Sequence, residues 1–274
     1  MPGRRKSLSA FAFSQYNAAM QVISLQSGSN GNCIYVETGG VKLLFDAGIS
    51  AIQAERRLAA HDRDIAGVDA VLISHDHIDH SRCTGVYHRK FGLPIFATAK
   101  TYRAAARYAL GEIDDLRHFT AGESLHFGEV TVETFSTPHD GVDGVVFVVD
   151  DGKRRLGILT DLGHVFSGLG DLIASLDAVV LESNYDPEML ANGPYPEFLK
   201  RRIEGPAGHI SNFEAAEVLK ANAGKRMKWA CLAHLSEDNN TPQLAVKTHR
   251  RLLGKRLPIF VATRYRVSDV MEVR

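Results

Sequence analysis

The stretch Ser74–His80, which reads Ser-His-Asp-His-Ile-Asp-His, is the most informative part of this 274-residue chain. It places three imidazoles and two carboxylates directly after the apolar run Val68–Ile73, which predicts a buried strand. Imidazoles and carboxylates are the ligands that zinc, manganese and iron take in proteins. The first two histidines share one side of an extended segment, and the last two residues begin the next turn. The stretch therefore predicts one short loop that serves two adjacent metal ions. The alternative is a solvated polar loop with unrelated histidines.

Five further apolar segments each lead to a polar residue that can bind a metal or move a proton. Taken singly, such an aspartate caps the following turn or helix, and a lone histidine is a structural residue. The repetition favours a common site, because one edge of a sheet would gather all of these groups. The segments and their polar residues are Val41–Phe45 with Asp46, Val130–Phe135 with His139, Arg155–Leu159 with Asp161, Ala178–Leu181 with Glu182, and Trp229–Ala233 with His234.

This series of residues resembles the five-motif signature of the metallo-β-lactamase fold hydrolases, and the resemblance runs from about Met20 to the C-terminus. Finer details resemble the YycJ/WalJ-type subgroup, whose members are regarded as nuclease-like metal-dependent hydrolases related to ribonuclease Z and the β-CASP nucleases. The resemblance implies an α/β (α+β) fold, a four-layer αββα sandwich with the site at one edge of the two sheets. The segments that carry the subgroup resemblance are Ser27–Asn32, Leu181–Asp186, Gly208–Asn212, Ala233–Ser236 and Asn239–Asn240.

The resemblance also implies a centre with two divalent metal ions. The histidine-rich ligand set favours Zn²⁺, while Mn²⁺ and iron stay open because metal availability also selects. Two such ions would lower the pKa of a shared water to roughly 7, and the bridging hydroxide would be the nucleophile. We expect Asp46 to orient a ligand histidine, since ligating imidazoles need a partner for their other nitrogen. The implied ligands are His75, His77 and His139 for the first metal, Asp79, His80 and His234 for the second, and Asp161 for both.

In ribonuclease Z relatives a glutamate and a histidine outside the metal ligands act together near the leaving group. Glu182 and His209 match those positions in order and local setting. A departing alkoxide needs a proton, which an imidazole held by a carboxylate can deliver. These two residues and Asp79 are therefore the expected catalytic residues. The alternative makes His209 a residue that only precedes a helix, and Glu182 a surface group at a strand end.

The loop Ser27–Asn32 is rich in small residues and would expose backbone N–H groups to a phosphate. A tight hairpin turn explains the same composition. The candidate phosphate-binding residues are Ser27, Ser29, Asn30 and Asn32.

Composition places the chain among ordinary globular proteins, with 45% hydrophobic and 23% charged residues. No apolar run approaches the roughly 18 residues of a membrane-spanning helix, so we expect no membrane partner. Three cysteines without a CxxC pair argue against a disulfide framework and favour the reducing cytoplasm. Residues 200–274 hold fifteen Lys or Arg against seven Asp or Glu, although the whole chain has a net charge of zero. This basic part would bind phosphates beside the metal site, or form solvated helix faces such as Lys247–Arg256.

The first 19 residues differ from the rest, because they carry Arg4–Lys6 and no acid appears before Glu37. We expect a disordered N-terminal extension over 1–19; a start codon upstream of the true start at Met20 and a transit-like segment are the alternatives. Residues 20–274 are expected to form a single hydrolase domain that begins with the strand Met20–Leu25. Helices are predicted over Thr101–Glu112 and over Asn212–Ala223, the second capped by Ser211 or Asn212.

The predicted function is metal-dependent phosphodiester hydrolysis on nucleic acid, in the manner of an exonuclease. The 72 residues between Asp161 and His234 are too few for the inserted β-CASP domain, and no Gly/Pro-rich arm like that of ribonuclease Z is found. The surface of the domain or the partner in a homodimer would therefore hold the nucleic acid. Two alternatives stay open. One is hydrolysis of a small cyclic phosphodiester, thioester or lactone, and the other is a non-catalytic, metal-stabilised regulatory domain.

Overall fold

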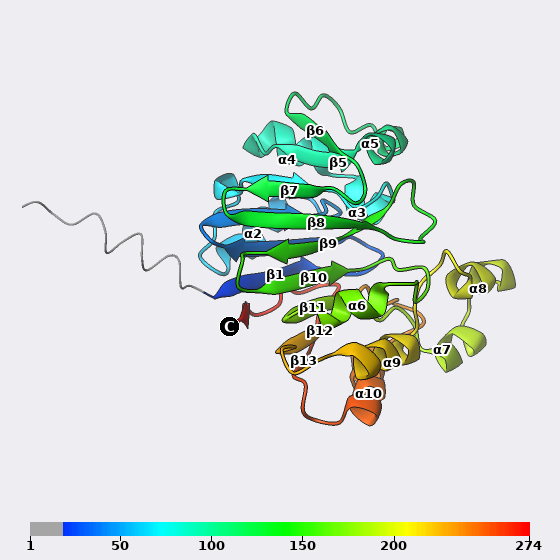
Figure 1. Cartoon of the computed structure of the whole chain (residues 1–274). Coiled ribbons are helices and arrows are strands. Elements are labelled where there is room, and N and C mark those ends of the chain that lie inside the picture. Colours follow the sequence, from blue (N-terminus) through cyan, green and yellow to red (C-terminus); the bar gives the residue numbers. More distant parts are fainter. Residues whose placement is uncertain (1–18) are drawn as a thin grey trace, which may run out of the picture.

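The computed structural model describes residues 19–274, which form two seven-stranded β-sheets with helices on both outer faces (Figure 1). The first sheet has the order β14-β1-β2-β3-β4-β5-β6, with β14 (Met271–Val273), β1 (Met20–Gln26), β2 (Cys33–Thr38), β3 (Val41–Phe45), β4 (Ala70–Leu72), β5 (Ile95–Thr98) and β6 (Leu116–Phe119). The second has the order β13-β12-β11-β10-β9-β8-β7, with β13 (Ile259–Val261), β12 (Trp229–Ala233), β11 (Ala178–Glu182), β10 (Arg155–Leu159), β9 (Val145–Asp150), β8 (Val130–Ser136) and β7 (Ser124–Phe127).

The helices fall into three groups. On the first sheet lie α2 (Ala51–Ala59), α4 (Thr84–Phe91) and α5 (Ala99–Ala105), with the short 3₁₀ helices η1 (Ile65–Gly67) and η2 (Ala106–Tyr108). On the second lie α6 (Leu169–Ala174), α9 (Asn212–Asn222) and α10 (Pro242–Leu253). Beyond the strand ends lie α3 (Ile78–Ser81), α7 (Pro187–Asn192) and α8 (Glu197–Glu204).

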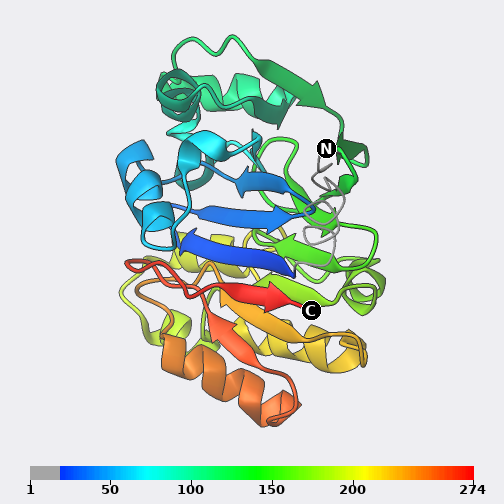
Figure 2. The same ribbon diagram turned by 90° about the vertical axis from the view of Figure 1, so that its left-hand side faces the viewer.

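Strand side chains alternate between two apolar layers, and this alternation builds the sandwich. In β9, Val145, Phe147 and Val149 belong to the core between the sheets, whereas Val146 and Val148 belong to the core under α6 and α9. A third core lies between the first sheet and its helices. The predicted four-layer αββα arrangement is therefore confirmed. Figure 2 shows that the C-terminal strand β14 lies beside β1, with which it pairs in antiparallel register.

The topology brings the ends of six strands together. Strands β3 and β4 are parallel, as are β10, β11 and β12. Strand β8 runs in the same direction as β10, because each is antiparallel to β9. The carboxyl ends of all six strands therefore lie at the same edge of the sandwich. The polar residues predicted from the sequence follow these strand ends.

Two predicted helices had different outcomes. Helix α9 begins at Asn212, and Ser211 is its N-cap in a capping box with Glu214. The helix predicted over Thr101–Glu112 is wrong at both ends. It begins at Ala99, because the Thr98 side chain accepts a hydrogen bond from the backbone N–H of Thr101. It is over by Ala109, whose φ of 53° is left-handed.

The strand predicted over Val68–Ile73 is shorter in the structure, Ala70–Leu72. The predicted N-terminal extension, 1–19, lies outside the described residues except for Ala19, so it stays a prediction. Within residues 19–274, no helix is long and apolar enough to cross a membrane. All three cysteines are described, and each is a free thiol.

Candidate metal centre

Three of the residues at the strand ends have left-handed backbone conformations. The φ angles are 65° for Asp46 after β3, 59° for Asp161 after β10 and 55° for His234 after β12. A non-glycine residue in this region costs on the order of 1–3 kcal/mol, and such residues gather at functional sites. Each turns its side chain out of the strand direction at the same edge of the sandwich.

The Ser74–His80 loop changes from extended chain to helix in the middle of the motif. The rings of His75 and His77 lie 4.6 Å apart between centroids, and α3 starts at Ile78. Gly48 allows this turn to pack against the loop after β3, because a Cβ at Gly48 would lie 1.7 Å from the carbonyl oxygen of Asp79. The backbone N–H of Ala47 also donates to the carbonyl of His80 at 2.7 Å.

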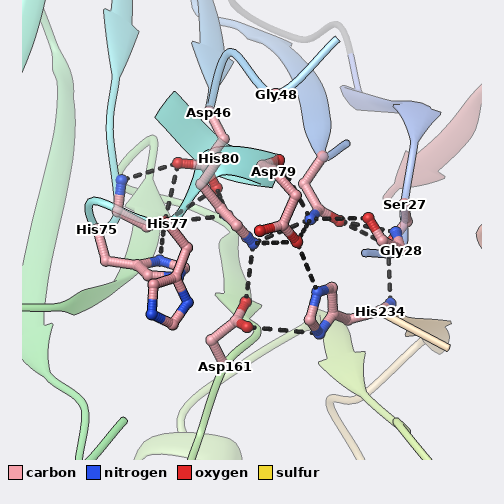
Figure 3. A network of polar contacts seen from close by, with 12 residues as sticks. Ser27, Gly28, Asp46, Gly48, His75, His77, Asp79, His80, Asp161 and His234 are labelled. Carbon is pink, nitrogen blue, oxygen red and sulfur yellow. Dashed lines mark hydrogen bonds and ion pairs between the residues drawn. The ribbon is translucent and has the colours of Figure 1, made fainter. Parts of the chain in front are cut away.

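The loops bring all seven predicted ligands into one cluster; Figure 3 labels all of them except His139. Asp161 lies between the two histidine groups: its Oδ2 is 3.3 Å from Nε2 of His80, and its Oδ1 is 3.4 Å from Nδ1 of His234. Four sets have ligand atoms within 4.8 Å of one another: His75, His77 and His139; Asp79, His80 and His234; His75, His80 and Asp161; and Asp161, Glu182, His209 and His234.

The donor atoms of this cluster fit divalent cations. Among residues 19–274, Nε2 of His75 and Oδ2 of Asp161 are buried without a hydrogen-bond partner, although the second lies within ion-pair distance of His80. This is costly for polar atoms unless something else binds them. Nδ1 of His139 faces the carbonyl of Gly208 at 2.8 Å, a bond in which the ring donates. Its Nε2 is therefore left as an acceptor and lies 3.2 Å from Nδ1 of His77. A cation is the group that such converging acceptors would bind.

Asp46 contacts His80, one of the candidate ligand histidines. Its Oδ2 lies 2.7 Å from Nδ1 of His80, and its Oδ1 accepts from the backbone N–H of Ser74 at 2.8 Å. The carboxylate thereby fixes the ring so that Nε2 of His80 faces Asp161. Its part as an orienting residue stays a proposal.

The cluster has opposite effects on the pKa values of its histidines. Burial lowers the pKa of His75 well below its ordinary value, and the neighbouring His80, His77 and His139 lower it further. Burial also lowers the pKa of His80, but the carboxylates of Asp161, Asp46 and Asp79 outweigh it and raise the value to about 9. His75 therefore presents a neutral imidazole to the cluster.

Glu182 and His209 form a direct pair at the edge of the cluster. Oε1 of Glu182 lies 2.7 Å from Nδ1 of His209, and the Glu182 side chain is fully buried. Burial raises the pKa of Glu182, but His209 and His234 outweigh it and hold the pKa well below its ordinary value. Its Oε2 accepts from the backbone N–H of Leu162 at 3.0 Å. The carboxylate is thus fixed and charged, and it orients His209.

The Ser27–Asn32 loop supports the cluster from the side of β1. Ser27 is buried, and its hydroxyl accepts from the backbone N–H of His234 at 2.8 Å. Asn32 is also buried; its amide oxygen accepts from the N–H of Gly28, and its amide nitrogen lies 3.2 Å from Oδ2 of Asp79. Ser29 lines the pocket beside the cluster. We therefore keep the phosphate-binding proposal for Ser29 and its neighbour Asn30, and infer a supporting part for the other two side chains.

Sequence reasoning gave no role to several residues that the structure places at the centre. Oδ1 of Asp140 lies 3.1 Å from Nε2 of His77, and the side-chain amide of Asn184 donates to the carbonyl of His234 at 2.8 Å. Asp140 follows His139 directly in the sequence, and this adjacency could have predicted that it lies beside the candidate ligands. Tyr195 lines the same pocket from a segment with no motif of its own, and Arg202, one of the cations of the basic part 200–274, lines it as well.

The basic C-terminal part lies only partly beside the centre. Arg226 and Lys228 precede β12, whereas His234 follows it, so a five-residue strand of about 16 Å separates them. Arg226 pairs with Asp177 instead. Of the three basic residues of α8, Lys200, Arg201 and Arg202, only Arg202 lines the pocket beside the centre.

The chain belongs to the beta-lactamase superfamily: the profile described as "Beta-lactamase superfamily domain" matches residues 42–234. This confirms the family predicted from the sequence and the class that it implies, a hydrolytic enzyme that binds divalent metal.

Two relatives with curated names cover most of the chain. One is "Exodeoxyribonuclease YycJ" of Bacillus anthracis, 38% identical over 81% of this chain and 84% of the relative. The other is "Exodeoxyribonuclease WalJ" of Streptococcus pneumoniae, 37% identical over 82% of this chain and 84% of the relative.

Solved structures show the same fold at low sequence identity. The metallo-beta-lactamase fold protein YhfI from Bacillus subtilis superposes with a TM-score of 0.70, at 16% identity over 93% of this chain and 100% of that one. The short form of human tRNase Z superposes with a TM-score of 0.63, at 16% identity over 92% of this chain and 100% of that one.

Proposed function

We propose that this protein is an exodeoxyribonuclease that hydrolyses phosphodiester bonds at a dinuclear metal centre. One observation carries the proposal. Oε1 of Glu182 lies 2.7 Å from Nδ1 of His209, and this pair is next to Asp161, which contacts both His80 and His234. Two relatives at 37–38% identity over more than four fifths of the chain are named exodeoxyribonucleases, which supports DNA as the substrate.

The ligand sets define how two cations would be held. His75, His77 and His139 would hold one cation, Asp79, His80 and His234 the other, and Asp161 would face both. Two bound divalent cations supply Lewis acidity and lower the pKa of a water molecule to about 7. We propose Zn²⁺ as the native metal because imidazoles outnumber carboxylates in the set, and Mn²⁺ is the second metal to test.

The chain's own residues orient these ligands and move the proton. Asp46 fixes His80, and Asp140 fixes His77 through its other ring nitrogen. When a phosphodiester breaks, the leaving oxygen needs a proton. Nδ1 of His209 is held by Glu182, so Nε2 is the atom that would carry a proton to that oxygen. His209 is partly exposed and lines the pocket, as this role requires.

A substrate panel tests the proposal. The purified protein, loaded with Zn²⁺ or Mn²⁺, would be assayed on linear and circular single-stranded DNA, duplex DNA, RNA, bis-p-nitrophenyl phosphate and a thioester. We expect cleavage of linear DNA from an end, cleavage of the small diester, and intact circles. Activity confined to the thioester would contradict the proposal. Cleavage of circles would contradict the exonuclease mode alone.

Two further predictions accompany this function. The homodimer predicted from the sequence stays a prediction, and light scattering of the purified protein measures its molar mass. The cytoplasmic location also stays a prediction, which fractionation of cells that produce the protein would test.

A further inference from the structure

Helix α8, Glu197–Glu204, stands apart from the other long helices because it has no buried residue. Packing against the core therefore explains little of its position. Its sequence places three consecutive cations, Lys200–Arg202, between the apolar pair Phe198–Leu199 and Ile203. Figure 1 shows it at the edge of the molecule, beyond the carboxyl ends of β10–β12.

The inner face of α8 forms one wall of the pocket over the metal centre. Leu199, Arg202 and Ile203 line a cavity of about 230 Å³, and His77 and Asp161 line the same cavity. This volume lies below the range of about 300–1,000 Å³ for pockets that enclose small ligands. A volume of this size fits only part of a larger substrate, such as the end of a strand. Among the described residues that line it, Arg202 is the only Arg or Lys.

Arg202 makes one side-chain hydrogen bond to the described residues, and its other N–H donors stay available for a ligand. Its Nε donates to Oδ2 of Asp140 at 2.7 Å, and Asp140 in turn lies 3.1 Å from His77. The two terminal NH₂ groups of Arg202 have no hydrogen-bond partner among residues 19–274, and the side chain is 58% exposed. A guanidinium with free terminal donors is suited to bidentate binding of a phosphate.

Phe198 lies four residues before Arg202, so both residues are on the same side of the helix. It is 74% exposed, the largest exposed fraction among the large hydrophobic residues described. A single exposed aromatic residue is common on protein surfaces. An exposed ring beside a free guanidinium is the pairing that binds single-stranded nucleic acid, because the ring stacks on a base and the cation binds the backbone.

The end of α8 is fixed in register with the catalytic pair. The backbone N–H of His209 donates to the carbonyl of Ile203 at 2.9 Å. A Cβ at Gly208 would lie 2.2 Å from the carbonyl oxygens of both Arg202 and Ile203, so only glycine allows this approach. A nucleotide bound on α8 would thus be held at a defined distance from His209.

We propose that α8 binds the substrate strand next to the scissile bond, with Phe198 stacked on a nucleobase and Arg202 on a backbone phosphate. This rests on the proposed nuclease function and names the residues that hold its substrate. The partner is single-stranded DNA, because a paired base offers no free face for stacking on Phe198.

The test compares two phosphodiester substrates, of which only the oligonucleotide has a neighbouring nucleotide that α8 could bind. For a single-stranded oligonucleotide, Phe198→Ala should raise KM by about 5- to 150-fold, the range for loss of one base–aromatic stack. Phe198→Trp should restore the wild-type KM. Arg202→Gln should raise KM by about tenfold and reduce the slope of log KM against log salt by about 0.7, because one phosphate contact is lost. On bis-p-nitrophenyl phosphate, which has no neighbouring nucleotide, Phe198→Ala should match the wild type.

Two matched variants serve as controls. Phe213→Ala removes an exposed phenylalanine from α9, and Arg201→Gln removes a cation from α8 that does not line the pocket. Both should leave the oligonucleotide KM within about twofold of the wild-type value, which lies below the smallest effect expected for one stack.

Each outcome separates this inference from the proposed function. If the wild type cleaves DNA and Phe198→Ala has an unchanged KM, the α8 proposal is overturned and the nuclease function stands. If Phe198→Ala changes the molar mass of the protein and leaves KM unchanged, Phe198 belongs to a contact between two copies, and the proposal is equally overturned. If the wild type cleaves no DNA, both proposals fail.

Discussion

The ligand cluster and helix α8 face the same pocket, but they are held in place by different means. In the cluster, His75, His80 and Asp161 are buried, and hydrogen bonds fix the rings. In α8 no residue is buried, and backbone contacts near its C-terminus fix its register. The comparison shows that the ligand cluster is held rigidly by buried hydrogen bonds, whereas the proposed DNA-binding surface on α8 is exposed. Changes in the cluster should therefore alter kcat and metal content, and changes around α8 should alter KM.

The largest effect is expected from Asp161→Asn, which removes the charge between the two ligand groups. Asparagine tolerates the left-handed conformation of residue 161, so the change tests the charge and leaves the backbone unstrained. Losing several kcal/mol of metal-derived stabilisation should lower kcat by about 10³-fold or more. Metal analysis of the purified protein should show fewer ions per chain. Asp62→Asn is the control, because exposed Asp62 also has a left-handed φ, 57°. Diester cleavage at the wild-type rate in Asp161→Asn would refute this account of the cluster.

The second prediction separates the catalytic pair from the metal ligands. His209→Ala should lower kcat on DNA by about 10²–10⁴-fold, the usual contribution of a positioned acid. The loss should be much smaller on bis-p-nitrophenyl phosphate, because nitrophenolate leaves without a proton. Metal content should stay at the wild-type value.

A loss of metal in His209→Ala would place the residue among the ligands instead. That outcome has a structural basis, since Asp161, Glu182, His209 and His234 also form a set with converging ligand atoms. Equal losses on both substrates would likewise argue against proton delivery by His209.

The third prediction concerns Gly208, which packs against the C-terminal end of α8 next to His209. Gly208→Ala would force its Cβ against two carbonyl oxygens at 2.2 Å, so α8 or His209 must move. Overpacking of this kind costs about 1–3 kcal/mol of unfolding free energy. We expect a lower Tm and a raised KM for DNA. Gly224→Ala, where a Cβ would meet nothing within 4 Å, is the control. A normal KM in a destabilised Gly208→Ala protein would mean that the position of α8 does not matter to substrate binding.

The fourth prediction concerns the pH dependence of stability and lies outside both regions. Burial of His249 on α10 lowers its pKa to about 4, although its bond to the carbonyl of Ala245 acts in the opposite direction. The unfolded chain binds this proton near the ordinary value of 6.5, so the unfolding free energy should fall as pH drops from about 6.5 to 4. The full difference is about 3 kcal/mol. Denaturant unfolding at several pH values should show this part of the slope in the wild type and not in His249→Leu. Identical slopes would contradict the pKa of His249.

The contrast between the regions also decides what the sequence could predict. The cluster could be predicted from the sequence because each candidate ligand follows an apolar strand, and parallel strands end at one edge of a sheet. Two of these strands, Val41–Phe45 and Trp229–Ala233, have the predicted bounds. The left-handed turns at Asp46 and Asp161 were hidden, because aspartate occurs in many other conformations. Helix α8 carries no motif, and its importance follows only from the pocket that it borders. The helix predicted over Thr101–Glu112 failed because an alanine- and arginine-rich pattern does not show the left-handed Ala109 and Gly111.

Anomalous diffraction from crystals of the zinc-loaded protein tests the central claim most directly. We predict two separate peaks, one ligated by His75, His77 and His139 and one by Asp79, His80 and His234, with Asp161 touching both. A single peak, or a metal bound through His209 while Asp161 stays free, would contradict the account.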